Sequence, residues 1–281
     1  MIEKIVKKIK SLPPLPESVQ KVREICNDPE GTIKDLVPVV KHDPMFTADI
    51  LKAANSPLYG FSRQITSINQ AVSLFGMGTI QGFAISYAMR KNFSADLGVY
   101  GIASNSLTKV STMQNALTNS WGKFQVSKYK DELITLSLIM ELGKMIAAKV
   151  LEEDNKTELF KEAISDAKTF EEILAIEKEY LTISSDQINA LMFKHWKFNE
   201  IMISIMQHIV KPEKADESIR KHSQVLRVIK EAILIKSPLS EQSIKLALEK
   251  AEKYNLDYQS LNDAIEIMTI MPPDEQTSIS S

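Results

Sequence analysis

The hydrophobic positions of this 281-residue chain recur mainly at the three- and four-residue spacing of amphipathic α-helices. Residues 43–54 show the pattern clearly, because Phe46, Ile50 and Ala54 fall on one helical face. Only 9 glycines and few runs of β-branched residues argue against a β fold with many turns. The chain is therefore predicted to be all-α.

Several boundaries of these helices are marked by local signals. Asp43-Pro44 places a carboxylate at an N-cap and a proline at the first helical position, and Asn55 to Pro57 ends the same helix. Ser67 is predicted to cap a further helix that ends at Gly76. Another apolar helix then follows, at about residues 79–90.

The second half of the chain continues as helix after helix. Residues 133–145 are apolar almost all round, which predicts one central buried helix. Further helices are predicted at residues 158–180 (two or three of them), 185–196, 199–210, 217–236, 240–254 and 260–271. Residues 217–271 are interpreted as a charged C-terminal extension, and residues 272–281 as a disordered tail.

The first ten residues form a basic amphipathic stretch, with Ile2, Ile5, Val6 and Ile9 on one face. Two interpretations are open, a helix that lies on a membrane surface and a short helix that docks on the protein itself. The shortness of the stretch favours docking. The interleaved lysines do not fit a signal peptide, no membrane span is predicted, and the single cysteine, Cys26, fits a reducing compartment. We therefore expect a cytoplasmic protein.

The charge balance does not favour a nucleic-acid-binding face, since the formal net charge is -2. One helix in the C-terminal extension nevertheless carries several basic residues, namely Arg220, Lys221, Arg227 and Lys230. They could bind nucleic acid, but their spacing favours a solvated helix face. A helix-turn-helix over residues 67–90 is also disfavoured, because its second helix carries apolar and aromatic side chains.

Three motifs near the N-terminus occur in a characteristic order, Leu12-Pro13-Pro14-Leu15-Pro16, then His42-Asp43-Pro44, then Leu51 to Ser56. Together they resemble the opening of the HDOD domain, a non-catalytic relative of the HD and HD-GYP phosphohydrolases. The resemblance covers residues 10–210. It implies a multi-helical HD-like bundle, with an N-terminal helical subdomain at residues 10–92 and a degenerate HD-like core at residues 104–210.

The resemblance also indicates where an HD enzyme would hold its metal ligands. The histidine, His-Asp, histidine and double-histidine positions correspond here to Asn119, Met140-Glu141, Ser185 and Gln207-His208. The later aspartate is expected within residues 226–231, which contain none. Metals in such sites polarise phosphate and lower the pKa of a bound water. With these ligands replaced, we expect no metal, no cofactor and no catalysis.

The four histidines fall on separate predicted elements. His42 is expected in a loop, and His195 and His222 at the surface or an interface. His208 could form a residual one-metal pair with Glu141, although a hydrogen-bonded core histidine is favoured, because two ligands do not make a stable site.

Glu141 lies in an apolar segment, and an unpaired buried carboxylate is costly. We expect it to meet Lys144, His208 or a backbone donor. The leading hypothesis is a non-catalytic signalling module that binds a protein partner or a nucleotide signal. The alternative is a degenerate metal-dependent phosphohydrolase that uses Glu141, Asp186 and His208.

Overall fold

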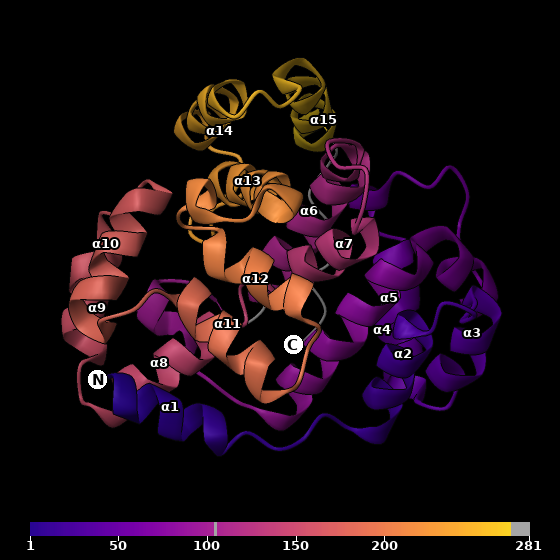
Figure 1. Ribbon diagram of the computed structural model, residues 1–281, viewed down its shortest axis with the longest axis horizontal. Coiled ribbons are helices and arrows are strands. Elements are labelled where there is room, and N and C mark those ends of the chain that lie inside the picture. Colours follow the sequence, from indigo (N-terminus) through magenta and orange to yellow (C-terminus); the bar gives the residue numbers. More distant parts are fainter. Residues whose placement is uncertain (104–105, 271–281) are drawn as a thin grey trace, which may run out of the picture.

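A computed structural model describes residues 1–103 and 106–270 of the chain. These residues form α-helices and short 3-10 helices, and their only β pairing is an isolated bridge between Ile233 and Pro238. The prediction of an all-α, multi-helical fold is confirmed (Figure 1).

The N-terminal helices gather around one long helix, α5, on the right-hand side of Figure 1. Helices α2, α3 and α4 all pack against it. The elements of this group are α2 (Glu17–Asn27), α3 (Ile33–Lys41), α4 (Pro44–Ala54), a 3-10 turn (Pro57–Tyr59) and α5 (Ile68–Asn92), and α1 (Ile2–Lys10) lies apart from them, at the lower left.

Helix α5 is broken near its start. Ser67 caps it by accepting a hydrogen bond from the Gln70 backbone N–H, and Gly76 then adopts φ 73° and ψ 175°, outside the helical region. A left-handed φ is strained for residues with a Cβ, so the break requires glycine. The prediction that one helix ends at Gly76 and another follows is confirmed. Among the described residues only α5 is long and apolar enough to span a membrane, and 67% of its apolar window is buried in the protein, as in a core helix.

The second half contributes α6 (Ser106–Ser120), α7 (Lys130–Ile139), α8 (Gly143–Glu153), α9 (Thr157–Ser165), α10 (Phe170–Leu181), α11 (Ser185–His195) and α12 (Glu200–His208). The single helix predicted over residues 133–145 is wrong, because α7 ends at Ile139 and α8 begins at Gly143. A Cβ on Gly143 would lie 2.0 Å from the Ser185 carbonyl oxygen, so glycine lets α8 begin directly against α11. Both helices are buried on nearly all sides, so hydrophobic periodicity gave no sign of the turn.

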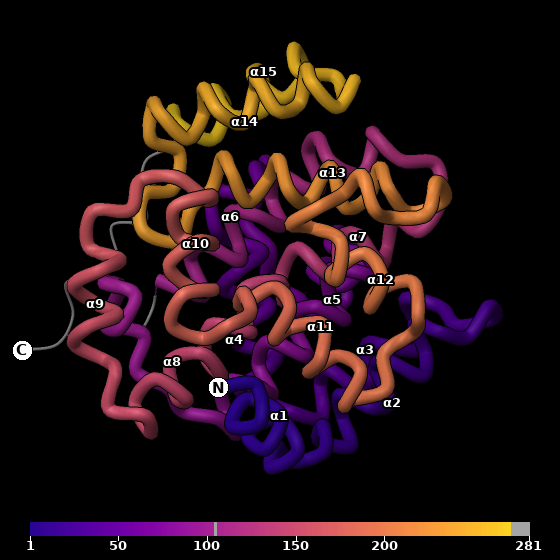
Figure 2. Tube along the Cα trace, turned by 60° about the vertical axis from the view of Figure 1, so that its left-hand side comes forward, coloured from indigo at the N-terminus to yellow at the C-terminus, as the bar shows by residue number. Residues whose placement is uncertain are grey.

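The C-terminal helices lie on the core. They are α13 (Glu217–Ala232), α14 (Glu241–Lys253) and α15 (Tyr258–Ile270). Helix α13 packs against α6, α12 and α14, and Figure 2 shows α14 and α15 side by side across the top of the molecule. Helix α13 ends at Ala232, four residues before the predicted end. The predicted tail, residues 272–281, lies outside the described residues.

Helix α1 packs against α8 and α11 through Ile5 and Ile9, which are buried. This confirms that it is a docking helix of the protein itself. The proline-rich segment that follows continues across the same side, because the indole N–H of Trp196 donates a hydrogen bond to the Pro13 carbonyl at 3.2 Å. Leu12 and Leu15 are buried there. The segment thus connects the N-terminal helices to α11.

The start of α4 offers a test of the predicted cap. Asp43 accepts hydrogen bonds from the backbone N–H groups of Met45 and Phe46, each at 3.0 Å. Asp43→Ala should lower the free energy of unfolding by about 1 kcal/mol, because both N–H groups lose their acceptor. Asp43→Asn keeps a side-chain oxygen at the cap and should lose much less. Urea denaturation measures both variants, and equal losses would contradict the capping role.

Candidate functional site

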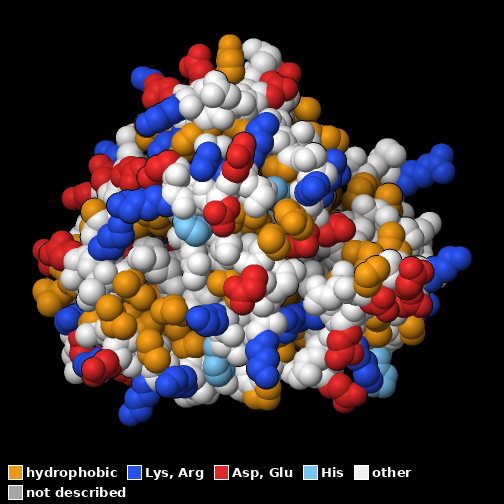
Figure 3. Space-filling view, in the orientation of Figure 1, with side chains coloured by type: hydrophobic (Ala, Val, Ile, Leu, Met, Phe, Trp, Pro, Cys, Tyr) orange, Lys and Arg blue, Asp and Glu red, His pale blue; other side chains and the backbone are white. Residues whose placement is uncertain are grey.

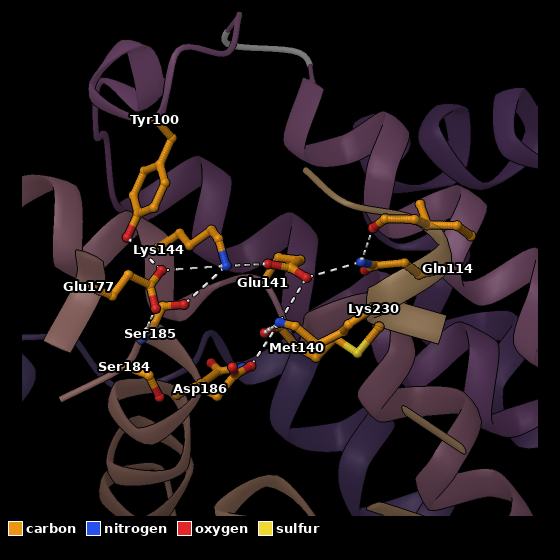
Figure 4. A network of polar contacts seen from close by, with 12 residues as sticks. Tyr100, Gln114, Met140, Glu141, Lys144, Glu177, Ser184, Ser185, Asp186 and Lys230 are labelled. Atoms are coloured by element: carbon orange, nitrogen blue, oxygen red, sulfur yellow. Dashed lines mark hydrogen bonds and ion pairs between the residues drawn. The ribbon is translucent and has the colours of Figure 1, made fainter. Parts of the chain in front are cut away.

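The turn between α7 and α8 places a carboxylate in the middle of the protein. Glu141 is only 3% exposed, and each of its carboxylate oxygens faces a different ammonium group (Figure 4). Oε1 lies 2.8 Å from Nζ of Lys230, and Oε2 lies 2.7 Å from Nζ of Lys144. The two lysines come from α13 and α8, so Glu141 joins helices that are distant in sequence.

Lys144 continues the contacts toward α10 and α11. Its ammonium group donates a hydrogen bond to the Ser185 hydroxyl at 3.0 Å and lies 3.7 Å from Glu177 Oε1. Glu177 in turn accepts hydrogen bonds from the Ser185 backbone N–H at 2.7 Å and from the Tyr100 hydroxyl at 3.0 Å. The Glu177 carboxylate is therefore held at both oxygens.

Lys230 continues the contacts on the other side. Its ammonium group lies 2.7 Å from Asp186 Oδ1, and Asp186 is 1% exposed. The Gln114 side chain donates a hydrogen bond from its amide nitrogen to Glu141 Oε1 at 3.0 Å. We call Glu141, Lys144, Glu177, Asp186 and Lys230 the buried ion cluster. It contains three carboxylates and two ammonium groups.

The charges of the cluster support one another. Burial acts to raise the pKa of Glu141, but Lys144 and Lys230 outweigh it and lower that pKa from 4.5 to about 2. Burial acts to lower the pKa of Lys144, but Glu141, Glu177 and Asp186 raise it above its usual range. Glu141 is therefore a carboxylate and Lys144 an ammonium ion at neutral pH.

Comparison with known proteins places the chain in a family. The family model of the HDOD domain matches residues 12–212, more than half of the chain. The chain belongs to the HDOD domain family.

Solved structures share the HDOD fold over almost the whole chain. A virulence factor from Campylobacter jejuni is 24% identical, with a TM-score of 0.57 and coverage of 96% of this chain and 98% of its own. A phosphohydrolase candidate from Shewanella amazonensis is 20% identical, with a TM-score of 0.64 and coverage of 95% and 97%. An HDOD domain protein of unknown function from Geobacter sulfurreducens is 16% identical, with a TM-score of 0.61 and coverage of 96% and 97%. These likenesses show the fold alone.

One curated relative also matches, over a short stretch. It is an uncharacterised protein of Treponema pallidum, 26% identical over 82 residues, which span 29% of this chain and 16% of that protein.

The HDOD domain brings together only some of the positions at which HD metal ligands were expected. Glu141, Met140 and Ser185 lie at the buried ion cluster, where the Met140 carbonyl oxygen is 3.5 Å from Lys230 Nζ. Asn119 belongs to a different network, since its amide donates to the Asn115 carbonyl at 3.1 Å. The residue of α6 that reaches Glu141 is Gln114, which the sequence reasoning missed.

The expectation that Glu141 meets Lys144 is confirmed by their 2.7 Å ion pair. His208 is half-buried, and its Nδ1 lies 2.7 Å from the Ser204 carbonyl oxygen one turn earlier in α12. His195 is exposed, as expected. Of the two positions expected for His222, the surface or an interface, the surface is wrong, because its side chain is 3% exposed and its Nε2 lies 2.8 Å from the Lys128 carbonyl oxygen.

The solvated position expected for the basic residues of α13 holds for the exposed Lys221 and is wrong for Arg227 and Lys230. Arg227 and Lys230 are 1% and 2% exposed. The Arg227 guanidinium lies over the Phe170 ring, 4.0 Å from its centroid, and pairs with Glu231 at 3.3 Å. These two cations are buried ion-pair partners and are not available at the surface.

The side chains at this site do not fit an HD metal centre. Glu141 and Asp186 are bound by ammonium groups, and Asn119, Met140 and Ser185 stand at the positions where the resemblance to HD enzymes leads us to expect histidines. Within residues 1–103 and 106–270, no three His, Cys, Asp or Glu side chains are grouped so that they could hold a metal ion. The geometry is that of a closed structural network, so we derive no catalytic step from it.

The cluster predicts a large effect from the loss of one lysine. Lys230→Met should lower the free energy of unfolding by about 3–5 kcal/mol, because Glu141 and Asp186 lose the ammonium group that they share. Lys21→Met is the matched control, since Lys21 makes a 2.8 Å ion pair with Glu17 on the protein surface. Thermal and urea denaturation should show little change for the control. Equal losses of unfolding free energy in the two variants would mean that burial of the ion cluster adds nothing to the stability of the protein.

The depressed pKa of Glu141 predicts a pH dependence. Its ion pairs contribute fully above pH 4.5, and this contribution is lost as the pH falls toward about 2, since the unfolded state takes up the proton first. Glu141→Gln lacks the contribution, so its deficit in unfolding free energy should be largest above pH 4.5 and shrink toward pH 2.

Urea denaturation across this pH range measures the deficit. The double variant Glu141→Gln/Lys144→Met should show the same dependence on pH, because both variants lack the Glu141 carboxylate. A deficit that stays constant with pH would show that the charge of Glu141 does not matter to stability.

Proposed function

We propose that this HDOD protein is a non-catalytic signal-transduction module, which acts in the cytoplasm by binding a protein partner or a nucleotide signal. The observation that carries the proposal is the pair of lysine ammonium groups on Glu141. Lys230 comes from residues 226–231, the segment in which an HD enzyme would supply its later aspartate. A cationic side chain thus stands where catalysis would need a metal ligand.

The membership of the family supports the same proposal. HDOD domains are related both to HD phosphohydrolases and to signal-transduction proteins, and one similar structure is described as a signal-transduction protein, from Marinobacter aquaeolei. That protein is 18% identical with a TM-score of 0.64, and this chain covers 60% of it. A module without a metal centre keeps the fold as a binding scaffold.

The second candidate is a degenerate metal-dependent phosphohydrolase, which the description of the Shewanella neighbour favours. Its residues would be Glu141, Asp186 and His208. Glu141 and Asp186 are both bound to Lys230, and the described contact of His208 is with its own helix. Activity would therefore require the buried ion cluster to open.

Metal analysis of the purified protein, together with turnover assays on cyclic dinucleotides and nucleotides, separates the two candidates. We expect substoichiometric Mn, Fe and Zn, and no hydrolysis above that of buffer, in conditions where an active HD-GYP enzyme turns over. Stoichiometric metal together with hydrolysis that is lost in both Glu141→Gln and His208→Ala would overturn the non-catalytic proposal. The second variant, at a half-buried position, guards against loss of activity through unfolding.

A further inference from the structure

The outer side of the C-terminal hairpin, which consists of α14 and α15, carries an open groove of about 490 Å³. Its apolar wall is formed by Ile244 and Leu248, one turn apart on α14, and by Tyr258 at the start of α15. Tyr258 is 47% exposed. An apolar groove beside a helix is the kind of surface that receives the apolar face of another amphipathic helix.

The rim of the groove has a definite charge. Its other lining residues all belong to α14 and are three glutamates and one lysine, Glu241, Glu249, Glu252 and Lys245. Lys245 lies 4.0 Å from Glu249, so the positive charge of the lysine is already partly balanced within the rim. Figure 3 shows acidic side chains beside apolar ones at the top of the molecule, where the hairpin lies. Complementarity therefore favours a basic occupant.

The hairpin is firmly held on its inner side, so the groove is available without rearrangement. Ala247 and Ala251 of α14 are fully buried, and the Ser243 hydroxyl donates to the Ala232 carbonyl of α13 at 3.1 Å. Lys250 lies 3.2 Å from the buried Glu231 of α13. The inner face of α14 is therefore anchored to the core, and its outer face borders the groove.

We propose that this groove binds a basic amphipathic helix of a partner protein. The inference rests on the proposed function as a partner-binding module, and it names the surface and the chemistry of the partner. Apolar side chains on one face of the partner helix contact Ile244, Leu248 and Tyr258. Lysines or arginines at the edges of that face pair with the glutamates of the rim.

Two other occupants fit the charges less well. Residues 271–281 of this chain contain Asp274 and Glu275 and no lysine or arginine, so they would bring like charge to the rim. A second copy that paired its α14 antiparallel, centred on Lys245, would place Glu241 opposite Glu249. Like charges directly opposite each other are unfavourable.

The test uses the full chain and two synthetic helical peptides of about 15 residues, a length at which helices become stable enough to compare. Both carry leucines at helical spacing. One has lysines at the flanking positions and the other has glutamates. Fluorescence anisotropy should show binding of the lysine peptide that weakens with added salt, and at least tenfold weaker binding of the glutamate peptide.

Variants assign the binding to the groove. Glu249→Lys/Glu252→Lys changes two exposed positions and leaves the fold intact. It should weaken binding of the lysine peptide about tenfold and strengthen binding of the glutamate peptide. Tyr258→Ser should weaken both. Glu179→Lys, a charge reversal at an exposed position of α10 away from the groove, is the control and should change the binding of neither peptide. Circular dichroism checks that every variant is folded.

The outcomes separate this inference from the proposed function. The proposed binding site would be overturned if the lysine peptide did not bind. It would also be overturned if Glu179→Lys weakened the binding as much as the groove variants do. A dimer in light scattering that the groove variants dissociate would overturn it as well, because a second copy would then be the occupant. Metal-dependent hydrolysis would overturn the proposed function while leaving the peptide result unchanged.

Discussion

A carboxylate in a protein interior must be compensated by positive charge or by hydrogen bonds, and Glu141 receives both from helices far apart in the sequence. Lys144 approaches it from α8, Lys230 from α13 and Gln114 from α6. None of these helices can move away without breaking an ion pair or a hydrogen bond of Glu141. The polar centre therefore fixes the arrangement of the HD-like core more narrowly than apolar packing alone would, because apolar contacts tolerate small shifts.

The N-terminal helices are joined to that core in a different way. They pack against α5, to which Asp49 of α4 adds an ion pair with Arg90 at 3.2 Å, and the proline-rich segment connects them to α11 beside Trp196. Arg23 of α2 adds to this junction, since its guanidinium lies 4.4 Å from the centroid of the Phe198 ring and donates to the Trp196 carbonyl at 3.1 Å. The first of the motifs that resemble the family, Leu12 to Pro16, is thus a structural link between two groups of helices. The buried ion cluster lies elsewhere, among α8, α10, α11 and α13.

The features that could be predicted from the sequence are those whose causes are local. The Asp43 cap and the break at Gly76 depend on a few neighbouring residues, and both are as predicted. The turn at residues 140–142 was missed, because apolar side chains surround both helices. The burial of Lys230 was missed for a related reason, since helical spacing shows which residues share a face and not what that face contacts. Gln114 belongs to the same class, because its role depends on a partner 27 positions away.

The location of Lys230 has a consequence for how the protein is made. The family match ends at residue 212, whereas the ammonium group shared by Glu141 and Asp186 lies in α13, beyond that limit. As the chain emerges from the ribosome, all three carboxylates of the buried ion cluster are therefore synthesised before Lys230. Domains generally fold as units during synthesis, and here the unit is complete only once α13 has emerged. The segment that the family model matches is thus shorter than the segment needed to complete the buried ion cluster.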